Sequence, residues 1–193
     1  MSNTWIAQDT NTNAAGSWTD KQREHNARNL YKFFKRKGWS IAALAAMTGN
    51  MQFESYLNPG QWETGKEPET DGGFGLVQWT PYTNFADWAG PTWRYNYDLQ
   101  MQRIQYELDN GLQWQSTSDY PISFYQFSRA RRSDYSIEWL TRAFEYCYER
   151  GTWNNQRVVY AERWYKFYHH LWLIDFLIVI DEKKKNKGGD INI

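Results

Sequence analysis

Apolar side chains recur every three or four positions over residues 26–51, which is the spacing of an amphipathic helix. The first predicted helix begins at Asn26 and ends near Gly38, because glycine commonly follows a last helical turn. Ser40 can cap a second helix that begins at Ile41. The apolar faces of the two predicted helices are Ala27, Leu30, Tyr31 and Phe34 for the first, and Leu44, Met47 and Met51 for the second.

Periodicity is lost over residues 58–81, which are rich in Asn, Pro, Gly and acidic side chains. A long irregular loop inside a compact domain is often functional. The passage "GFGLVQW", residues 73–79, predicts a small β hairpin within this loop. Thr80 and Pro81 resemble a helix N-cap followed by a proline in the first turn.

Helical spacing returns after this loop. It predicts a short helix that ends at Gly90, two longer helices that end at Gly111 and Gly151, and a final helix that begins near Asn155. Few runs alternate between apolar and polar residues as strands do, so the expected fold class is mainly α with a small β hairpin. The apolar faces of the two longer helices are Met101, Ile104 and Leu108, and Ile137, Leu140, Phe144 and Cys147.

The two ends of the chain differ from its helical middle. Residues 1–21 are rich in Asn, Thr, Ser and Gly and are interpreted as a loose arm, followed by one domain over residues 22–170. Residues 171–193 form an apolar and then charged tail, in which the apolar run begins at Leu171 and ends at Ile180. Ten residues are about half of what a helix needs to span a bilayer. We expect this run to pack on the domain or on a neighbouring subunit; insertion into a membrane is the alternative.

Composition narrows the function classes. The chain has 22 Lys and Arg against 22 Asp and Glu, and this balance argues against an electrostatically driven nucleic-acid binder. The single cysteine and three histidines, two of them adjacent, argue against a metal site, and we expect no cofactor. The N-terminus lacks the basic start and apolar block of a secretory signal. Aromatic residues make up 19% of the chain, which fits a core of large rings or a groove for sugar rings.

Glu54 is the first candidate for chemistry. It follows Met47 by seven residues and Met51 by three, so it lies at the end of the apolar face of the second predicted helix. Contact with apolar atoms disfavours the ionised carboxylate and favours the protonated form that a general acid needs. The alternative is a glutamate at a helix end that is solvated or paired with a lysine.

Four segments in order resemble the phage tail lysozyme family, the glycosidases that small-tailed bacteriophages carry on the tail tip to breach peptidoglycan. They are "GNMQFES", "NPGQW", "GFGLVQWTP" and "YERG". The first three are specific; "YERG" is weaker, because the family often has proline where this chain has Gly151. The resemblance covers residues 26–168. More distantly, the Glu-Ser pair and "GLVQ" are similar to segments of lytic transglycosylases and goose-type lysozymes.

The resemblance implies an α+β, lysozyme-like fold with a hairpin beside the active-site groove. It also implies cleavage of the β-1,4 bond between N-acetylmuramic acid and N-acetylglucosamine, which opens the host wall locally for genome entry. In that fold Glu54 protonates the glycosidic oxygen, and Ser55 supports it. Gln78 hydrogen-bonds the glycan from the opposite wall. The resemblance gives Trp62 and Thr80 to the substrate side as well, and it implies that Trp79 supports the wall or stacks on a sugar. The alternative for Gln78 is a tight hairpin in which its amide satisfies local backbone groups.

A second carboxylate is the usual partner of a glycosidase acid. Asp71, 17 residues after Glu54, lies on the glycine-rich loop and could position the attacking water. The other acidic residues of this loop, Glu63, Glu67 and Glu69, are rivals, and Asp71 alternatively is a turn residue. A lytic transglycosylase would need none of them, because a hydroxyl of the substrate attacks.

Tyr148 and Glu149 lie at the end of a predicted helix. The resemblance implies that one of them reaches across the groove, with Tyr148 orienting Glu54 and Glu149 in support. Alternatively, Tyr148 packs in the core and Glu149 pairs with Arg150 on the surface.

Three rival functions follow from the same residues. They are a lytic transglycosylase, a structural tail component that has kept the fold and lost activity, and the wall-opening lysozyme of a conjugative element. The expected partners are peptidoglycan strands and other tail proteins in the virion, the latter through the run from Leu171 to Ile180. Nucleic acid is not an expected partner, and membrane contact is not favoured.

Overall fold

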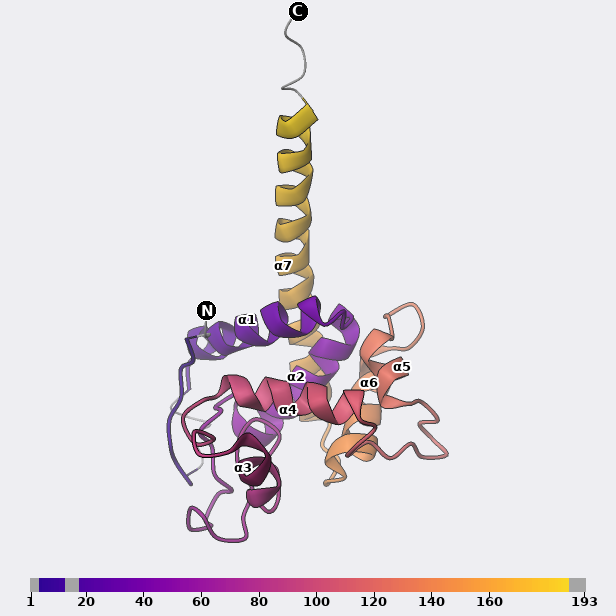
Figure 1. The fold of residues 1–193 in the computed structure, drawn as a ribbon. Helices are drawn as coiled ribbons and strands as arrows, with labels where there is room; N and C mark the ends of the chain where they lie inside the picture. Colours follow the sequence, from indigo (N-terminus) through magenta and orange to yellow (C-terminus); the bar gives the residue numbers. More distant parts are fainter. Residues whose placement is uncertain (1–3, 13–17, 188–193) are drawn as a thin grey trace, which may run out of the picture.

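A computed structural model describes residues 4–12 and 18–187, and within them the fold is mainly helical, as predicted (Figure 1). The helices are α1 (Asp20–Arg36), α2 (Ile41–Ser55), α3 (Thr83–Ala89), α4 (Asp98–Asp109), α5 (Phe124–Arg129), α6 (Ile137–Phe144), the π-helical turn η2 (Glu145–Glu149) and α7 (Gln156–Lys187).

Local capping explains where the first helices begin. Thr19 and Gln22 form a reciprocal capping box, so α1 begins at Asp20, six residues before the predicted start. Ser40 accepts a hydrogen bond from the backbone N–H of Ala43 at 3.0 Å and caps α2 at the predicted position.

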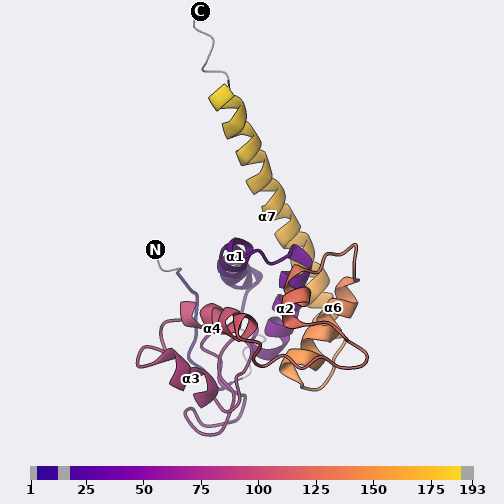
Figure 2. The ribbon, with the colours of Figure 1, turned by 45° about the vertical axis from the view of Figure 1, so that its right-hand side comes forward.

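The central helix α2 is buried along most of its length and lies against the first half of α7, with α6 beside both (Figures 1 and 2). Its Gly49 makes the close approach possible: a Cβ at this position would lie 2.7 Å from the backbone of Arg157 and from Ala161. The packing of these two helices brings the C-terminal end of α2 next to the N-terminal end of α7.

The predicted β hairpin is not formed as a pair of strands in the described residues. Isolated bridges join Trp62 to Phe74 and Phe74 to Trp79. The chain turns too tightly for a ladder, because Gly75 and Gln78 both have positive φ angles, of 84° and 50°. Packing of large rings holds the loop instead, with the centroids of Trp62 and Phe74 4.7 Å apart.

The expected cap at Thr80 is wrong. Its Oγ1 donates to the carbonyl of Gln78 at 2.9 Å, and the residue that precedes the first turn of α3 is Tyr82. The predicted end of this helix at Gly90 is confirmed.

Residues 4–12 are held along the domain, so "loose" does not describe this part of the N-terminal arm. Asn26 donates to the carbonyl of Ile6 at 2.7 Å, and Asn58 donates to that of Gln8 at 2.6 Å. Residues 1–3 and 13–17 lie outside the described residues, as do residues 188–193 of the tail. The division into residues 1–21, 22–170 and 171–193 remains a proposal.

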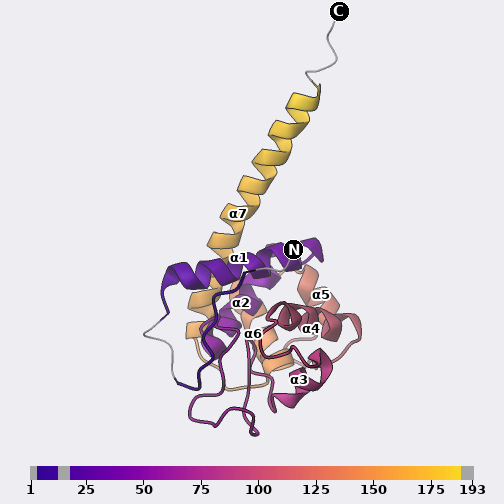
Figure 3. The same cartoon turned by 60° about the vertical axis from the view of Figure 1, so that its left-hand side comes forward.

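Helix α7 continues far beyond the domain (Figures 1 to 3). Asp175 ties the first part of this extension to α1, because it accepts from the hydroxyl of Tyr31 at 2.9 Å and from Nζ of Lys35 at 2.5 Å. No helix within residues 4–12 and 18–187 is long and apolar enough to cross a membrane. The large apolar side chains exposed on the extension are Trp172, Leu173, Ile174, Phe176, Leu177, Ile178 and Val179.

Candidate active site

Glu54 lies in the last turn of α2, and its side chain is 23% exposed. Its Oε1 is 2.5 Å from Nη2 of Arg157, in the first turn of α7. The expected environment of apolar atoms alone is therefore wrong, because a guanidinium faces the carboxyl. The alternative of a paired glutamate describes the structure better, although the partner is an arginine and not a lysine.

Arg157 is shared between two carboxylates. Its Nη1 lies 2.9 Å from Oε2 of Glu145, a fully buried side chain at the start of η2. The same nitrogen donates to Oδ1 of Asn50 at 3.1 Å, and the guanidinium lies 4.2 Å from the centre of the Phe53 ring. Arg157 itself is only 1% exposed, so the ends of three elements meet around one buried cation.

Two carboxyls of η2 hold their protons more tightly than usual. Burial raises the pKa of Glu145 to about 7; Arg157 opposes this shift and the charge of Glu54 adds to it. Burial also raises the pKa of Glu149 well above its usual value, and the charges of Glu54 and Glu145 reinforce the shift. Oε1 of Glu149 is buried without a hydrogen-bond partner in the described part of the chain. Protonated carboxyls therefore persist at this junction toward neutral pH.

The turn η2 replaces the last turn of the predicted helix. π-helical turns are rare and often occur at functional sites. Here η2 places Glu145 and Tyr148 in the interior, and it ends at Arg150 in a left-handed conformation. A Cβ at the next residue, Gly151, would lie 3.0 Å from Oε1 of Glu145, so a side chain there would crowd the buried carboxyl.

A cavity of about 400 Å³ brings several predicted residues together. Glu149 also belongs to the group around Arg157, because the charges of Glu54 and Arg157 both act on its carboxyl. It therefore connects the ionic cluster to the cavity, whereas Glu54 is not among the residues that line it. The predicted residues that do line the cavity are Gln78, Trp79, Thr80, Tyr148 and Glu149.

The amide of Gln78 is bonded within its own loop. Its Nε2 donates to the carbonyls of Gln61 at 3.0 Å and Gly75 at 2.9 Å. This agrees with the alternative for Gln78, in which its amide satisfies local backbone groups. Gln78 is half-buried at the cavity wall, and a contact with glycan remains a proposal.

The two predicted tryptophans are buried. Trp79 donates to Glu107 at 3.2 Å and stacks on Phe85, so it supports the wall from behind. Trp62 donates to Asp9 at 2.8 Å and does not line the cavity. The support of the wall by Trp79 is one of its two predicted roles, and stacking of its ring on a sugar remains a proposal.

Tyr148 does not orient Glu54. Its buried hydroxyl donates to Oε2 of Glu107 on α4, whose Oε1 accepts from Arg103 at 2.7 Å. Glu107 was not predicted as a site residue from the sequence. Its position three residues after Ile104, on the apolar face of the predicted helix, was the available signal.

The loop acids are not brought to Glu54 by any described contact. The side chain of Asp71 is 82% exposed and lies 3.3 Å from Nζ of Lys66, which lowers the pKa of this carboxyl. Glu63 accepts from the backbone N–H of Gly73 at 3.0 Å, and Glu69 pairs with Arg94. The candidates for a second carboxylate therefore stay on the loop, and no described contact joins them to the cluster at η2.

Ser55 connects the end of α2 to the glycine-rich passage. Its buried Oγ donates to the carbonyls of Met51 and Leu76, at 2.9 and 3.0 Å. Gln100, which the sequence analysis missed, accepts from the N–H of Leu76 at 2.8 Å and donates to the carbonyl of Pro59 at 2.7 Å. Together these side chains fix the cavity wall relative to α2.

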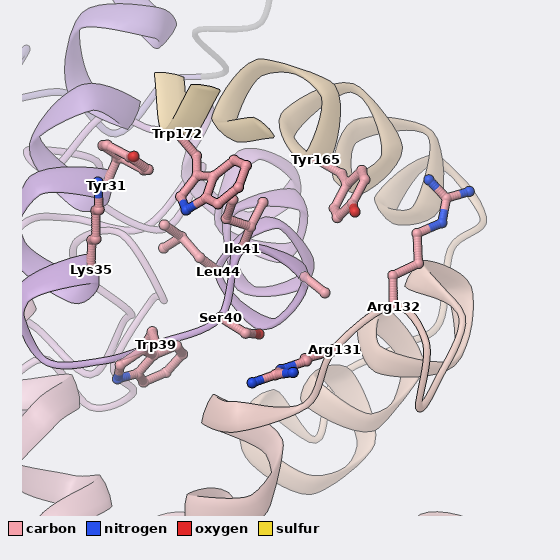
Figure 4. A pocket seen from close by; sticks show the side chains of 11 residues that line it. Tyr31, Lys35, Trp39, Ser40, Ile41, Leu44, Arg131, Arg132, Tyr165 and Trp172 are labelled. Atoms are coloured by element: carbon pink, nitrogen blue, oxygen red, sulfur yellow. The ribbon is translucent and has the colours of Figure 1, made fainter. Parts of the chain in front are cut away.

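A second cavity, of about 420 Å³, lies between α1, the start of α2 and α7 (Figure 4). Aromatic side chains and cations surround it, among them Tyr31, Trp172, Lys35 and Arg131. No predicted site residue and no carboxyl side chain is among the described residues that line it. The first cavity, in contrast, is lined by the carboxyls of Glu107 and Glu149.

The described residues contain no group of three or more His, Cys, Asp or Glu side chains able to hold a metal ion.

Comparison with known proteins gives the family. The model of the phage tail lysozyme family matches residues 25–168, close to the span of the resemblance. Morphogenesis protein 1 of Bacillus phage B103 is 37% identical over 150 residues, which cover 76% of this chain and 40% of that protein. The chain belongs to the phage tail lysozyme family.

Proposed function

We propose that this protein is a tail-associated peptidoglycan hydrolase of a bacteriophage. It cleaves the β-1,4 bond between N-acetylmuramic acid and N-acetylglucosamine and so opens the host wall locally for genome entry. Family membership supports the general activity. The observation that carries the site is the cluster of Glu54, Glu145 and Glu149 around Arg157, next to a cavity of about 400 Å³.

In the proposed reaction Glu54 donates a proton to the glycosidic oxygen as the bond to the sugar breaks. Water then attacks the sugar carbon and loses a proton to a base. Asp71 is the proposed base, and the loop would have to carry its exposed carboxylate to the cavity when glycan binds. Gln78 and Thr80 would contact the glycan at the cavity wall.

The decisive experiment is Glu54→Gln, assayed on purified peptidoglycan. Loss of a positioned proton donor should lower turnover by about 10²- to 10⁴-fold and leave sedimentation with peptidoglycan unchanged. Glu138→Gln is the matched control, because this glutamate is 57% exposed and pairs only with Arg142 on its own helix in the described contacts. Wild-type turnover by the Glu54 variant would refute the assignment. Mass spectrometry of the products separates hydrolysis from transglycosylation, since only the latter leaves anhydromuramyl ends.

A structural role in the tail is the second candidate. The relative is named for morphogenesis, and the chain spans 40% of that protein's length. The exposed apolar side chains of the α7 extension would bind other tail proteins in the virion. Replacing Leu177, Ile178 and Val179 together by polar residues should leave glycan cleavage unchanged and reduce incorporation into particles. A folded wild-type protein that cleaves no peptidoglycan would favour the structural role.

A further inference from the structure

Three residues that line the cavity of about 400 Å³ have an unusual backbone conformation. Gln78, Gln113 and Arg150 carry side chains, and yet their φ angles are 50°, 64° and 56°. Side chains strain the backbone in this left-handed region, and residues strained in this way are concentrated at binding and catalytic sites. Contacts around the cavity therefore hold its polar wall in place against the local preference of the backbone.

Gln113 and Arg150 hold each other at the cavity. Nη1 of Arg150 donates to the carbonyl of Gln113 at 2.6 Å, and Nε2 of Gln113 donates to the carbonyl of Tyr148 at 2.9 Å. The backbone N–H of Arg150 donates to the carbonyl of Glu145 at 2.6 Å and closes the turn η2. Within residues 4–12 and 18–187, the exposed side chain of Arg150 makes no other hydrogen bond. A guanidinium has five N–H groups, so most of those of Arg150 are available to a ligand.

The charge of Arg150 is not matched by a carboxylate of the same cavity. The carboxyls that line this cavity belong to Glu107 and Glu149. Glu107 is paired with Arg103, whose Nε lies 2.7 Å from its Oε1. Burial raises the pKa of Glu149 well above its usual value, so this carboxyl keeps its proton toward neutral pH. The predicted alternative of a Glu149–Arg150 ion pair is not found among the described contacts, and Arg150 therefore brings an excess positive charge to the cavity.

The remaining polar side chains of the cavity are neutral. The glycine-rich loop contributes Gln78 and Thr80, and α3 contributes Asn84. Neutral amides and hydroxyls suit the hydroxyl and acetamido groups of a sugar, whereas a guanidinium suits an anion. The cavity therefore fits a sugar that carries an acidic substituent.

We infer that Arg150, positioned by Gln113, binds a carboxylate of the glycan substrate. The inference rests on the proposed function, in which the substrate is peptidoglycan. The two sugars of this polymer differ in one group, because N-acetylmuramic acid carries a lactyl group that N-acetylglucosamine lacks. The carboxylate belongs to this lactyl group or to the peptide attached to it. A guanidinium matches the two oxygens of a carboxylate with parallel N–H groups, so Arg150 makes the cavity specific for acid-bearing glycan.

The test is the binding of soluble glycan fragments to the Glu54→Gln protein, measured by isothermal titration calorimetry so that no cleavage is needed. The ligands are a chitin tetramer, which has no carboxylate, and peptidoglycan tetrasaccharides with and without their peptides. At low salt, an acid-bearing tetrasaccharide should bind about tenfold more tightly than the chitin tetramer. Arg150→Gln, added to Glu54→Gln, should abolish this preference and change the affinity for the chitin tetramer by less than about twofold.

The peptide-free and peptide-bearing ligands identify the source of the carboxylate. Tighter binding of the peptide-free tetrasaccharide assigns it to the lactyl group, whose carboxyl is free only when the peptide is absent. Tighter binding of the peptide-bearing tetrasaccharide assigns it to the peptide. Both results support the carboxylate subsite. Equal affinities for all ligands, no binding of any of them, or a preference that survives Arg150→Gln would overturn it.

Arg36→Gln is the matched control, because Arg36 is also an exposed arginine without a described ion pair and lies at the end of α1. It should leave the preference unchanged. Should Arg150→Gln fail to fold, the salt dependence decides. The preference should be largely lost at about 1 M NaCl, and a preference that salt does not change would overturn the inference. An enzyme that cleaves peptidoglycan without this preference would refute the subsite and keep the proposed function, whereas an inactive wild type with an Arg150-dependent preference would do the reverse.

Discussion

Two acidic regions of this chain differ in how their charges are held. In the glycine-rich loop, Asp71 is exposed and forms a surface ion pair with Lys66, and Glu69 pairs with Arg94. At the α2–η2–α7 junction, Glu145 and Arg157 are buried. The sequence has more acidic residues in the loop, but the buried carboxyls are at the junction. Burial raises the pKa of Glu145 and Glu149 there, whereas Lys66 lowers the pKa of Asp71 in the loop.

The largest expected effect is on stability, and it is measured by removing one arginine that pairs with the acids of each region. Arg157→Met leaves buried carboxylates without a counterion, which should lower the free energy of unfolding by about 3–5 kcal/mol. Arg94→Met is the matched control, because Arg94 lies outside the loop and pairs with its Glu69. Its side chain is 29% exposed and pairs with partly exposed Asp9 and Glu69, so its loss should cost about 1 kcal/mol or less. Urea denaturation at neutral pH measures both; equal losses would mean that the junction is not special.

A smaller effect concerns how stability depends on pH. The pKa of Glu145 is about 7 in the folded protein against an ordinary 4.5, so the folded state keeps a proton that the unfolded chain has lost between these values. The stabilising contribution of Glu145 is therefore fully present below pH 4.5 and disappears as pH rises through about 7. The difference in unfolding free energy between wild type and Glu145→Gln should fall across this range.

The control for this pH experiment lies on α6. Glu138 carries an exposed carboxyl paired with Arg142, so Glu138→Gln should differ from wild type by a nearly constant amount between pH 4.5 and 8. A constant difference for Glu145→Gln as well would show that its carboxyl titrates like an exposed one.

Local patterns predicted most of the helices because their determinants are local. Ser40 caps α2 through a hydrogen bond to the backbone N–H three residues away, at the predicted start of this helix. Ser136 caps α6 in the same way, although no start was predicted for this helix. The prediction of a hairpin was wrong because glycines and packed rings, and not strand pairing, hold residues 73–79.

The partners of the site residues were harder to predict, because they come from distant parts of the chain. Arg157 is 103 residues from Glu54, and Glu107 is 41 residues from Tyr148. No spacing rule connects positions so far apart. The sequence and the family resemblance could indicate Glu54, Gln78 and Glu149 as candidates, but not which cation neutralises Glu54 or which carboxylate binds Tyr148.

The smallest expected effect on stability belongs to the loop. Asp71→Asn removes one exposed charge that is paired with Lys66 at the surface, so the urea midpoint of unfolding should stay almost unchanged. Because Asp71 is the proposed base, Asp71→Asn should nevertheless lower the rate on peptidoglycan by about 100-fold. A change of less than about threefold would mean that the loop acids stay apart from the junction during turnover and that Asp71 is not the base. Lys66→Gln removes the same ion pair and keeps the carboxylate of Asp71. If Asp71→Asn is slow because the base is lost, Lys66→Gln should keep the wild-type rate. If it is slow because the loop is disturbed, Lys66→Gln should be slow as well.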